Sequence, residues 1–227
     1  MDKHVCLIPS GEYWGGLNGV SEERLGDRGY DVDEFEETGA GEEIEGARRL
    51  YEKIREDYSH ADELNLIGHC SAGFSALYLL EEYSEDVFEG IDNVNIIALD
   101  TPTGISRGEE EYKLDLEDFP EKVDIYAVYP EVTAGENRLE DVNTVEVGVL
   151  EDLNKKMIEE DYSRDGGNSD LLKSIMEGAH RFEGPEETVG EVINAILEGN
   201  TRQLEEIDDV TDYSSAKSSG RKVVARS

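Results

Sequence analysis

Short apolar runs alternate along this chain with longer segments in which apolar residues recur every three or four positions. The short runs predict buried β-strands at 4–8, 30–35, 64–67, 94–99, 123–128 and 145–149. The longer segments predict amphipathic helices at 42–58, 71–83 and 186–197. Alternating strands and helices form parallel sheets with right-handed crossovers. We therefore expect an α/β fold, a three-layer α/β/α sandwich around a mostly parallel central sheet.

The same pattern predicts one folded domain over residues 1–199, a normal size for a single hydrophobic core. Residues 103–122, rich in glycine and then in acidic side chains, interrupt the alternation and predict an excursion that forms a lid. Residues 200–227 lose the periodicity and end in a polar, locally basic stretch, which predicts a disordered tail.

The charge balance is extreme, with 56 Asp and Glu against 21 Lys and Arg and a formal net charge of −35. Such a surface repels nucleic acid and anionic membranes, so neither is expected as a partner. In roughly 1 M salt the Debye length shrinks to about 3 Å, which relieves the self-repulsion of the folded chain. The composition therefore predicts a protein adapted to a halophilic cytoplasm, the alternative being an ordinary acidic protein.

The chain shows no secretory or membrane-spanning pattern. The N-terminal segment lacks a basic region followed by a long apolar run, and no stretch approaches 18 apolar residues. A cytoplasmic protein without a membrane span is expected. The two cysteines, Cys6 and Cys70, are too few for a disulfide framework or a thiolate metal cage. No His-x-x-x-His or Cys-x-x-Cys pair is present, so neither a metal nor another cofactor is expected.

The most informative segment is 65–74, with the sequence Asn-Leu-Ile-Gly-His-Cys-Ser-Ala-Gly-Phe. It runs from an apolar strand through small residues into a helix, the setting of a nucleophile elbow. In the pattern G-x-nucleophile-x-G, counting from Gly68 selects Cys70 and puts Ala72 at the second glycine position. A rival register makes Ser71 the nucleophile, and a third interpretation is a small buried cysteine in a non-enzyme.

This segment resembles the elbow of the α/β-hydrolase superfamily, in which Gly-His-Ser-x-Gly-Gly is common and a minority of members use cysteine. The resemblance covers about residues 3–198 and implies the α/β-hydrolase fold. It departs from the common pattern in having Cys for Ser and Ala for Gly. Cysteine as nucleophile implies acyl transfer with thioesters or activated esters.

A nucleophilic thiol needs a base, and the chain has four histidines. His4 opens a strand, His60 lies in a polar loop, and His69 sits inside the elbow beside Cys70. His180 lies just before the final helix, where hydrolases of this superfamily carry the catalytic histidine. It is therefore the expected general base, the alternative being a histidine of a surface loop.

The acid that orients the base has three candidates. Asp100 directly follows the predicted strand at 94–99, at the carboxyl edge where open α/β sheets place their sites. This strand end resembles that of the thioesterases of polyketide and nonribosomal peptide synthesis, in which the triad aspartate stands there and is often followed by proline. Glu131 and Asp152 occupy the later position that most other hydrolases use. Asp100 is preferred.

The resemblance also implies an oxyanion hole made of two backbone N–H groups. One is that of Ser71 at the start of the elbow helix, where the helix dipole also favours a thiolate. The other is that of Glu12, or alternatively that of Gly11, in the glycine-containing loop after the first strand.

Together these residues predict an acyl hydrolase of the thioesterase-like branch, acting on a small-molecule acyl ester or thioester through an acyl-Cys70 intermediate, with His180 as base and Asp100 as acid. A carboxylesterase or lipase-like hydrolase is one alternative. The other is a hydrolase-fold protein that serves as a non-catalytic binding or scaffold module.

Overall fold

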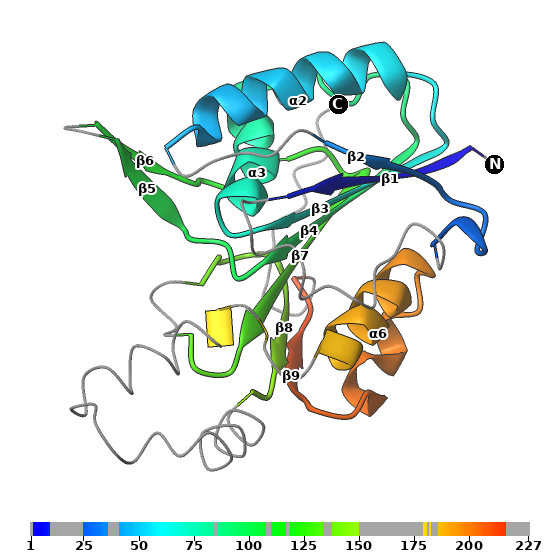
Figure 1. The fold of residues 1–227 in the computed structure, drawn as a ribbon, viewed down its shortest axis with the longest axis vertical. Helices are drawn as coiled ribbons and strands as arrows, with labels where there is room; N and C mark the ends of the chain where they lie inside the picture. Colours follow the sequence, from blue (N-terminus) through cyan, green and yellow to red (C-terminus); the bar gives the residue numbers. More distant parts are fainter. Residues whose placement is uncertain are drawn as a thin grey trace, which may run out of the picture.

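A seven-stranded sheet with helices on both faces forms the centre of the computed structural model (Figure 1). The structure describes residues 2–9, 25–35, 41–83, 86–107, 110–116, 119–133, 138–149, 179–180, 182 and 186–216. The strand order is β2-β1-β3-β4-β7-β8-β9. The strands are β1 (Lys3–Ile8), β2 (Asp31–Glu34), β3 (Glu63–His69), β4 (Asn93–Leu99), β7 (Val123–Pro130), β8 (Asn143–Val147) and β9 (Val210–Ser214).

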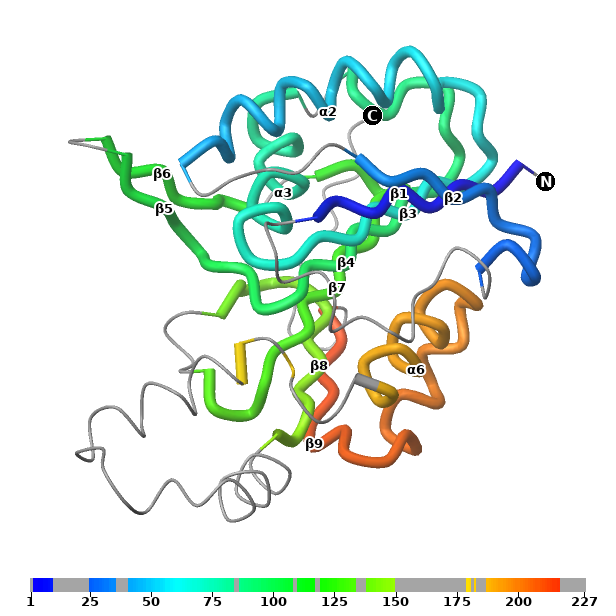
Figure 2. The backbone as a smooth tube through the Cα atoms, viewed as in Figure 1, coloured from blue at the N-terminus to red at the C-terminus, as the bar shows by residue number. Residues whose placement is uncertain are grey.

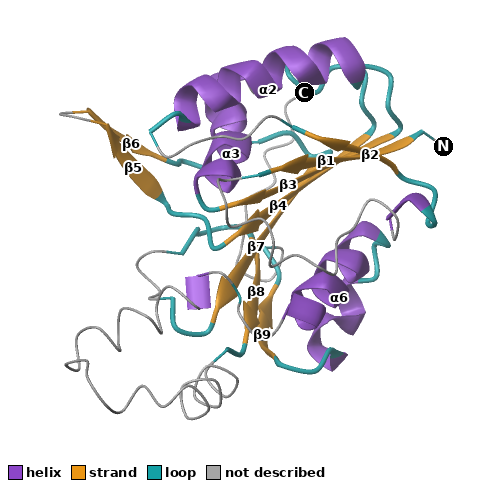
Figure 3. Ribbon diagram, viewed as in Figure 1, coloured by secondary structure: helices purple, strands orange, loops and turns teal. Residues whose placement is uncertain are grey.

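All neighbouring strands from β2 to β8 pair in parallel, and only β9 pairs antiparallel, with β8. Figure 3 shows helices α2 (Glu43–Asp57) and α3 (Ser71–Tyr83) on one face and α6 (Glu186–Leu197) on the other. The prediction of a three-layer α/β fold with a mostly parallel sheet is confirmed. The predicted strands and helices are all present, with ends shifted by a few residues.

Two cores lie on opposite faces of the sheet because successive strand residues point to opposite sides. In β1, Cys6 and Ile8 pack with α2 and α3, whereas Val5 and Leu7 pack with α6. The central strands are buried on both faces, as parallel strands covered by helices are. Both cores therefore fix the position of the strand ends at which the loops begin.

The segment predicted as a lid contains a hairpin of its own. Strands β5 (Gly104–Arg107) and β6 (Glu110–Lys113) pair antiparallel and form a sheet separate from the central one. The tube in Figure 2 shows this hairpin projecting from the sheet beside α3. The ring of Tyr112 on β6 meets that of Tyr78 on α3 edge to face, with centroids 6.1 Å apart. The predicted excursion thus exists, and its role as a lid stays a prediction.

The predicted boundary between residues 199 and 200 is wrong. Residues Thr201–Glu206 form the 3-10 helix η3, and β9 follows as an edge strand of the central sheet. Leu204 is fully buried in the core under α6. The apolar pattern does not predict β9 because this edge strand has mostly exposed side chains and lacks the apolar alternation of a half-buried strand. Residues 217–227 of the predicted tail lie outside the described residues.

If η3 and β9 belong to the folded unit, Leu204→Ala should lower the free energy of unfolding by about 2–5 kcal/mol, the usual cost of deleting a buried leucine side chain. Gln203→Ala is the matched control because Gln203 is exposed on the same 3-10 helix. Denaturant unfolding in molar KCl measures both. Equal stabilities of the two variants would contradict the inclusion of this segment in the core.

Candidate active site

The elbow, residues 68–73, joins the end of β3 to the start of α3 through Cys70. Cys70 has φ of 52°, in the left-handed region that non-glycine residues seldom occupy. Its N–H donates to the Leu99 carbonyl at the end of β4, 2.9 Å away, which continues the pairing of β3 with β4 past the strand end. The Cys70 side chain is partly exposed at this edge.

Two glycines allow the strand and the helix of the elbow to meet. A Cβ on Gly68 would lie 2.7 Å from the backbone nitrogen of Gly73, and a Cβ on Gly73 would lie 1.9 Å from Oγ1 of Thr101. Thr101 is itself buried and follows Asp100 at the end of β4. The small residues that predicted the elbow are therefore required by contact, and Ala72, fully buried, is accommodated at the position where the common pattern has glycine.

Asp100 stands at the same edge, one strand further along. Its N–H donates to the Val128 carbonyl of β7 at 2.8 Å, and its φ of 41° is again left-handed. Oδ1 accepts a hydrogen bond from the Thr133 hydroxyl at 2.9 Å, and Oδ2 hydrogen-bonds to Nδ1 of His180. The carboxylate is thus held from both sides, and 13% of its side chain is exposed.

His180 lies between Asp100 and Cys70. The pKa of His180 is raised to about 10, and the largest cause is its hydrogen bond to Asp100, followed by its interaction with Cys70. Burial of the ring disfavours the positive charge and so opposes this rise. Because Asp100 engages Nδ1, Nε2 is the ring nitrogen left for the thiol. The imidazole is 38% exposed and so accessible from solvent. At neutral pH the ring carries the proton, which favours an imidazolium paired with the sulfur.

His69 is a part of this site that the sequence did not reveal as such. It is buried, its Nε2 lies 2.7 Å from the His180 carbonyl oxygen, and its ring centroid lies 4.6 Å from that of His180. Burial, chiefly, and the neighbouring His180 lower the pKa of His69 to about 4. Its position before Cys70 was the only signal, because its partner lies 111 residues away.

Of the other predicted site residues, the structure describes two, Glu131 and Ser71. Glu131 lies at the end of β7, where its Oε1 accepts from the Val149 N–H at 2.9 Å, so it ties β7 to the segment after β8. Ser71 opens α3, and its side chain is buried. Glu12 and Asp152 lie outside the described residues. Of the two candidate acids that the structure describes, Asp100 is the one whose carboxylate meets His180.

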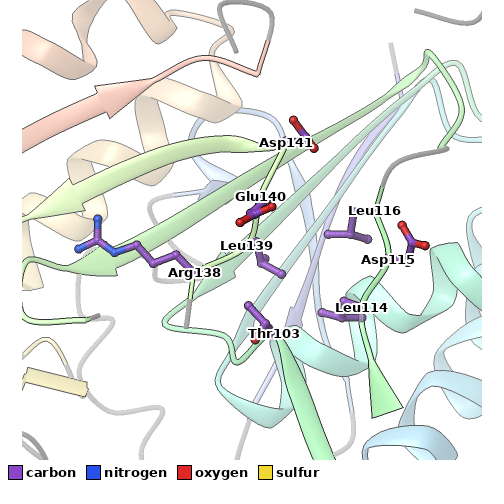
Figure 4. A pocket seen from close by; sticks show the side chains of 8 residues that line it. All are labelled: Thr103, Leu114, Asp115, Leu116, Arg138, Leu139, Glu140 and Asp141. Carbon is purple, nitrogen blue, oxygen red and sulfur yellow. The ribbon is translucent and has the colours of Figure 1, made fainter. Parts of the chain in front are cut away.

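A cavity of about 440 Å³ is lined by Thr103, in the loop after β4, and by residues of the segments 114–116 and 138–141. Figure 4 shows Leu114, Leu116 and Leu139 facing one another across it with Thr103, whereas Arg138 points away. Arg138 is engaged elsewhere, since it pairs with Glu146 at 2.6 Å. The carboxylates of the lining belong to Asp115, Glu140 and Asp141.

Within the described part of the chain, no group of three or more His, Cys, Asp or Glu side chains is arranged to hold a metal ion. None of the helices in that part is both long enough and apolar enough to cross a membrane.

Comparisons with known proteins identify no family. No protein-family model matches the sequence, and no curated protein does either. One solved structure that is similar in part is described as the crystal structure of the gene lin2722 products from Listeria innocua. It has a TM-score of 0.42 and 12% identity, over 63% of this chain and 75% of that chain. Similarity at this level carries no information about activity.

If the contact between Gly73 and Thr101 shapes the elbow, Gly73→Ala should destabilise the protein by about 1–3 kcal/mol, the usual cost of overpacking, even though alanine is the better helix former. Gly26→Ala is the matched control, since Gly26 has no atom within 4 Å of the added Cβ. Adding Thr101→Ala to the Gly73 variant should recover part of the loss, because it removes Oγ1. Denaturant unfolding measures all three; equal stabilities of the Gly73 and Gly26 variants would refute the close approach.

Proposed function

We propose that this protein is an acyl hydrolase of the α/β-hydrolase type that acts on acyl thioesters or activated esters through an acyl-Cys70 intermediate. The observation that carries the proposal is the hydrogen bond between Asp100 and His180, with Cys70 interacting with the same imidazole, at the carboxyl edge of a parallel sheet. Chain order supports it as well, because nucleophile, acid and histidine follow one another in the order of that superfamily.

A protonated His180 beside Cys70 is the arrangement that a thiolate mechanism uses. The Cys70 thiolate, paired with the His180 imidazolium, attacks the acyl carbonyl and forms a carbon–sulfur bond. His180 then gives its proton to the leaving thiol or alcohol as the bond to it breaks. Water attacks the acyl-Cys70 thioester, neutral His180 takes the proton of that water, and the thiolate departs from the carboxylic acid product.

The remaining groups act on the transition state and on the orientation of the base. The Ser71 N–H belongs to the first turn of α3, where amides lack partners within the helix, so it suits a developing oxyanion. Asp100 keeps Nδ1 protonated, which directs Nε2 toward the sulfur. Glu12 remains the proposed second donor.

A thioester substrate suits this nucleophile better than an amide. Attack by a thiolate on a thioester exchanges one carbon–sulfur bond for another, so acylation is nearly balanced in energy. Leu114, Leu116 and Leu139 give the cavity that also contains Thr103 an apolar surface suited to an acyl chain, and Leu114 and Leu116 lie just after the β5–β6 hairpin. The thioesterase-like branch is therefore the finer proposal.

The decisive experiment measures hydrolysis of a neutral thioester, an acyl-N-acetylcysteamine, and of a p-nitrophenyl ester in molar KCl. A neutral thioester avoids the repulsion that an anionic carrier meets at a protein of net charge −35. Cys70→Ala and His180→Ala should each lose at least about 100-fold in kcat/KM. Mass spectrometry should find an acyl adduct on Cys70 of the wild type.

The matched control is Cys6→Ala. Cys6 is fully buried, and burial raises the pKa of its thiol to about 12, so this variant should keep both activity and adduct. Equal rates in wild type, Cys70→Ala and His180→Ala, with no adduct, would overturn the proposal and leave a binding or scaffold protein.

A second prediction separates the candidate acids. Asp100→Asn should lower kcat about 100-fold or more and lower the pKa of His180, because Asp100 is the largest cause of its rise. Glu131→Gln should stay within about twofold of wild type, since its amide oxygen can still accept from the Val149 N–H. Steady-state rates from pH 5 to pH 10 test both; a larger loss in the Glu131 variant would reassign the acid.

A further inference from the structure

His69 ties the backbone of His180 to the elbow. It is the last residue of β3, so its position is fixed by the pairing of β3 with β4 and by the burial of its ring. Its Nε2 lies 2.7 Å from the His180 carbonyl oxygen. Two adjacent residues of the elbow thus both interact with His180: His69 contacts its backbone carbonyl and Cys70 interacts with its side chain.

The chemistry of the contact defines its direction. A carbonyl oxygen only accepts, so the hydrogen must be on Nε2 of His69. The pKa of His69, lowered to about 4, keeps the ring neutral at physiological pH. His69 therefore donates a hydrogen bond without placing a second positive charge beside the His180 imidazolium, which an ionised histidine in this place would do.

The segment around His180 depends on such contacts for its position. Phe182 has φ of 51°, and its N–H closes a turn on the Ala179 carbonyl at 2.9 Å. The His69 ring packs against both aromatic rings of this turn, with centroids 4.6 Å from His180 and 6.5 Å from Phe182. Asp100 restrains the imidazole at Nδ1, but one hydrogen bond leaves the ring free to swing about it. The contact of His69 with the His180 carbonyl adds a restraint on the backbone of the same residue.

We propose that His69 is a positioning residue of the acyl-transfer reaction, holding the His180 backbone through its Nε2–H so that the imidazole stays aligned with Cys70. This inference rests on the proposed function, in which His180 and Cys70 exchange a proton. A misplacement of about 1 Å between reacting groups can cost about 100-fold in rate.

The test compares His69→Gln with His69→Asn. The Gln amide nitrogen reaches about as far as Nε2 and can donate to the same carbonyl, whereas the Asn amide stops near the position of Nδ1. Both bury an amide, so a merely structural role predicts the same outcome for the two. His60→Gln, in an exposed turn, is the control for replacing a histidine.

Two readouts are needed. The first is kcat and KM for the neutral thioester. His69→Asn should lower kcat at least tenfold with little change in KM, whereas His69→Gln should keep most of the wild-type kcat. The second is the rate of Cys70 alkylation by iodoacetamide between pH 4 and pH 10. Alkylation of Cys70 should persist to a lower pH in wild type and His69→Gln than in His69→Asn. The pH profile of His69→Asn should approach that of His180→Ala.

The alkylation profile separates the two proposals because it needs no substrate. If wild type and His180→Ala are alkylated with the same pH dependence, the Cys70–His180 pair of the proposed function fails. If these two differ but His69→Asn behaves as wild type in both readouts, or if Gln is no better than Asn, the positioning role of His69 is overturned and the proposed function stands.

Discussion

The close approach of Gly68 to Gly73 is the contact on which the arrangement of the site depends. It lets β3 turn into α3 within a few residues, and the turn requires the left-handed backbone of Cys70. A side chain on either glycine would separate strand from helix and carry the sulfur away from the sheet edge. Backbone strain of this kind costs about 1–3 kcal/mol and persists only where the surrounding packing imposes it. Here the two cores impose it, since both elements are buried along most of their length.

The same constraint recurs around the site. Within the described residues, five non-glycine residues have positive φ, and three of them, Cys70, Asp100 and Phe182, lie at or beside the candidate site. Two of these three follow directly on parallel strands whose pairing continues one residue past the strand end. A parallel sheet places neighbouring strand ends side by side. The distance between Cys70 and Asp100 is therefore a property of strand pairing, whereas the position of His180 depends on side-chain contacts.

This difference explains which features could be predicted from the sequence. The strands, the helices and the elbow arise from local patterns, and the preference for Asp100 rests on its place at the carboxyl end of a strand and on the resemblance of that strand end to the thioesterases. His69 could not be assigned a role because its hydrogen bond joins residues 111 positions apart. The sequence does not predict β9 because an edge strand with mostly exposed side chains has no apolar alternation to reveal it. The sequence favours Asp100 over Glu131 without excluding the latter, and the structure shows that the Asp100 carboxylate is the one of these two that meets an imidazole.

The acidic surface and the site respond to salt in different ways. The predicted setting, molar salt, shortens the Debye length to about 3 Å and so removes most of the interaction between exposed carboxylates. The rise in the pKa of His180 comes first from hydrogen bonds to Asp100 and Cys70, which act at contact distance in a partly buried place. Salt therefore relieves the repulsion that opposes folding while leaving the imidazolium and its partners intact. A large negative charge on the surface and a local positive charge in the site are compatible for this reason.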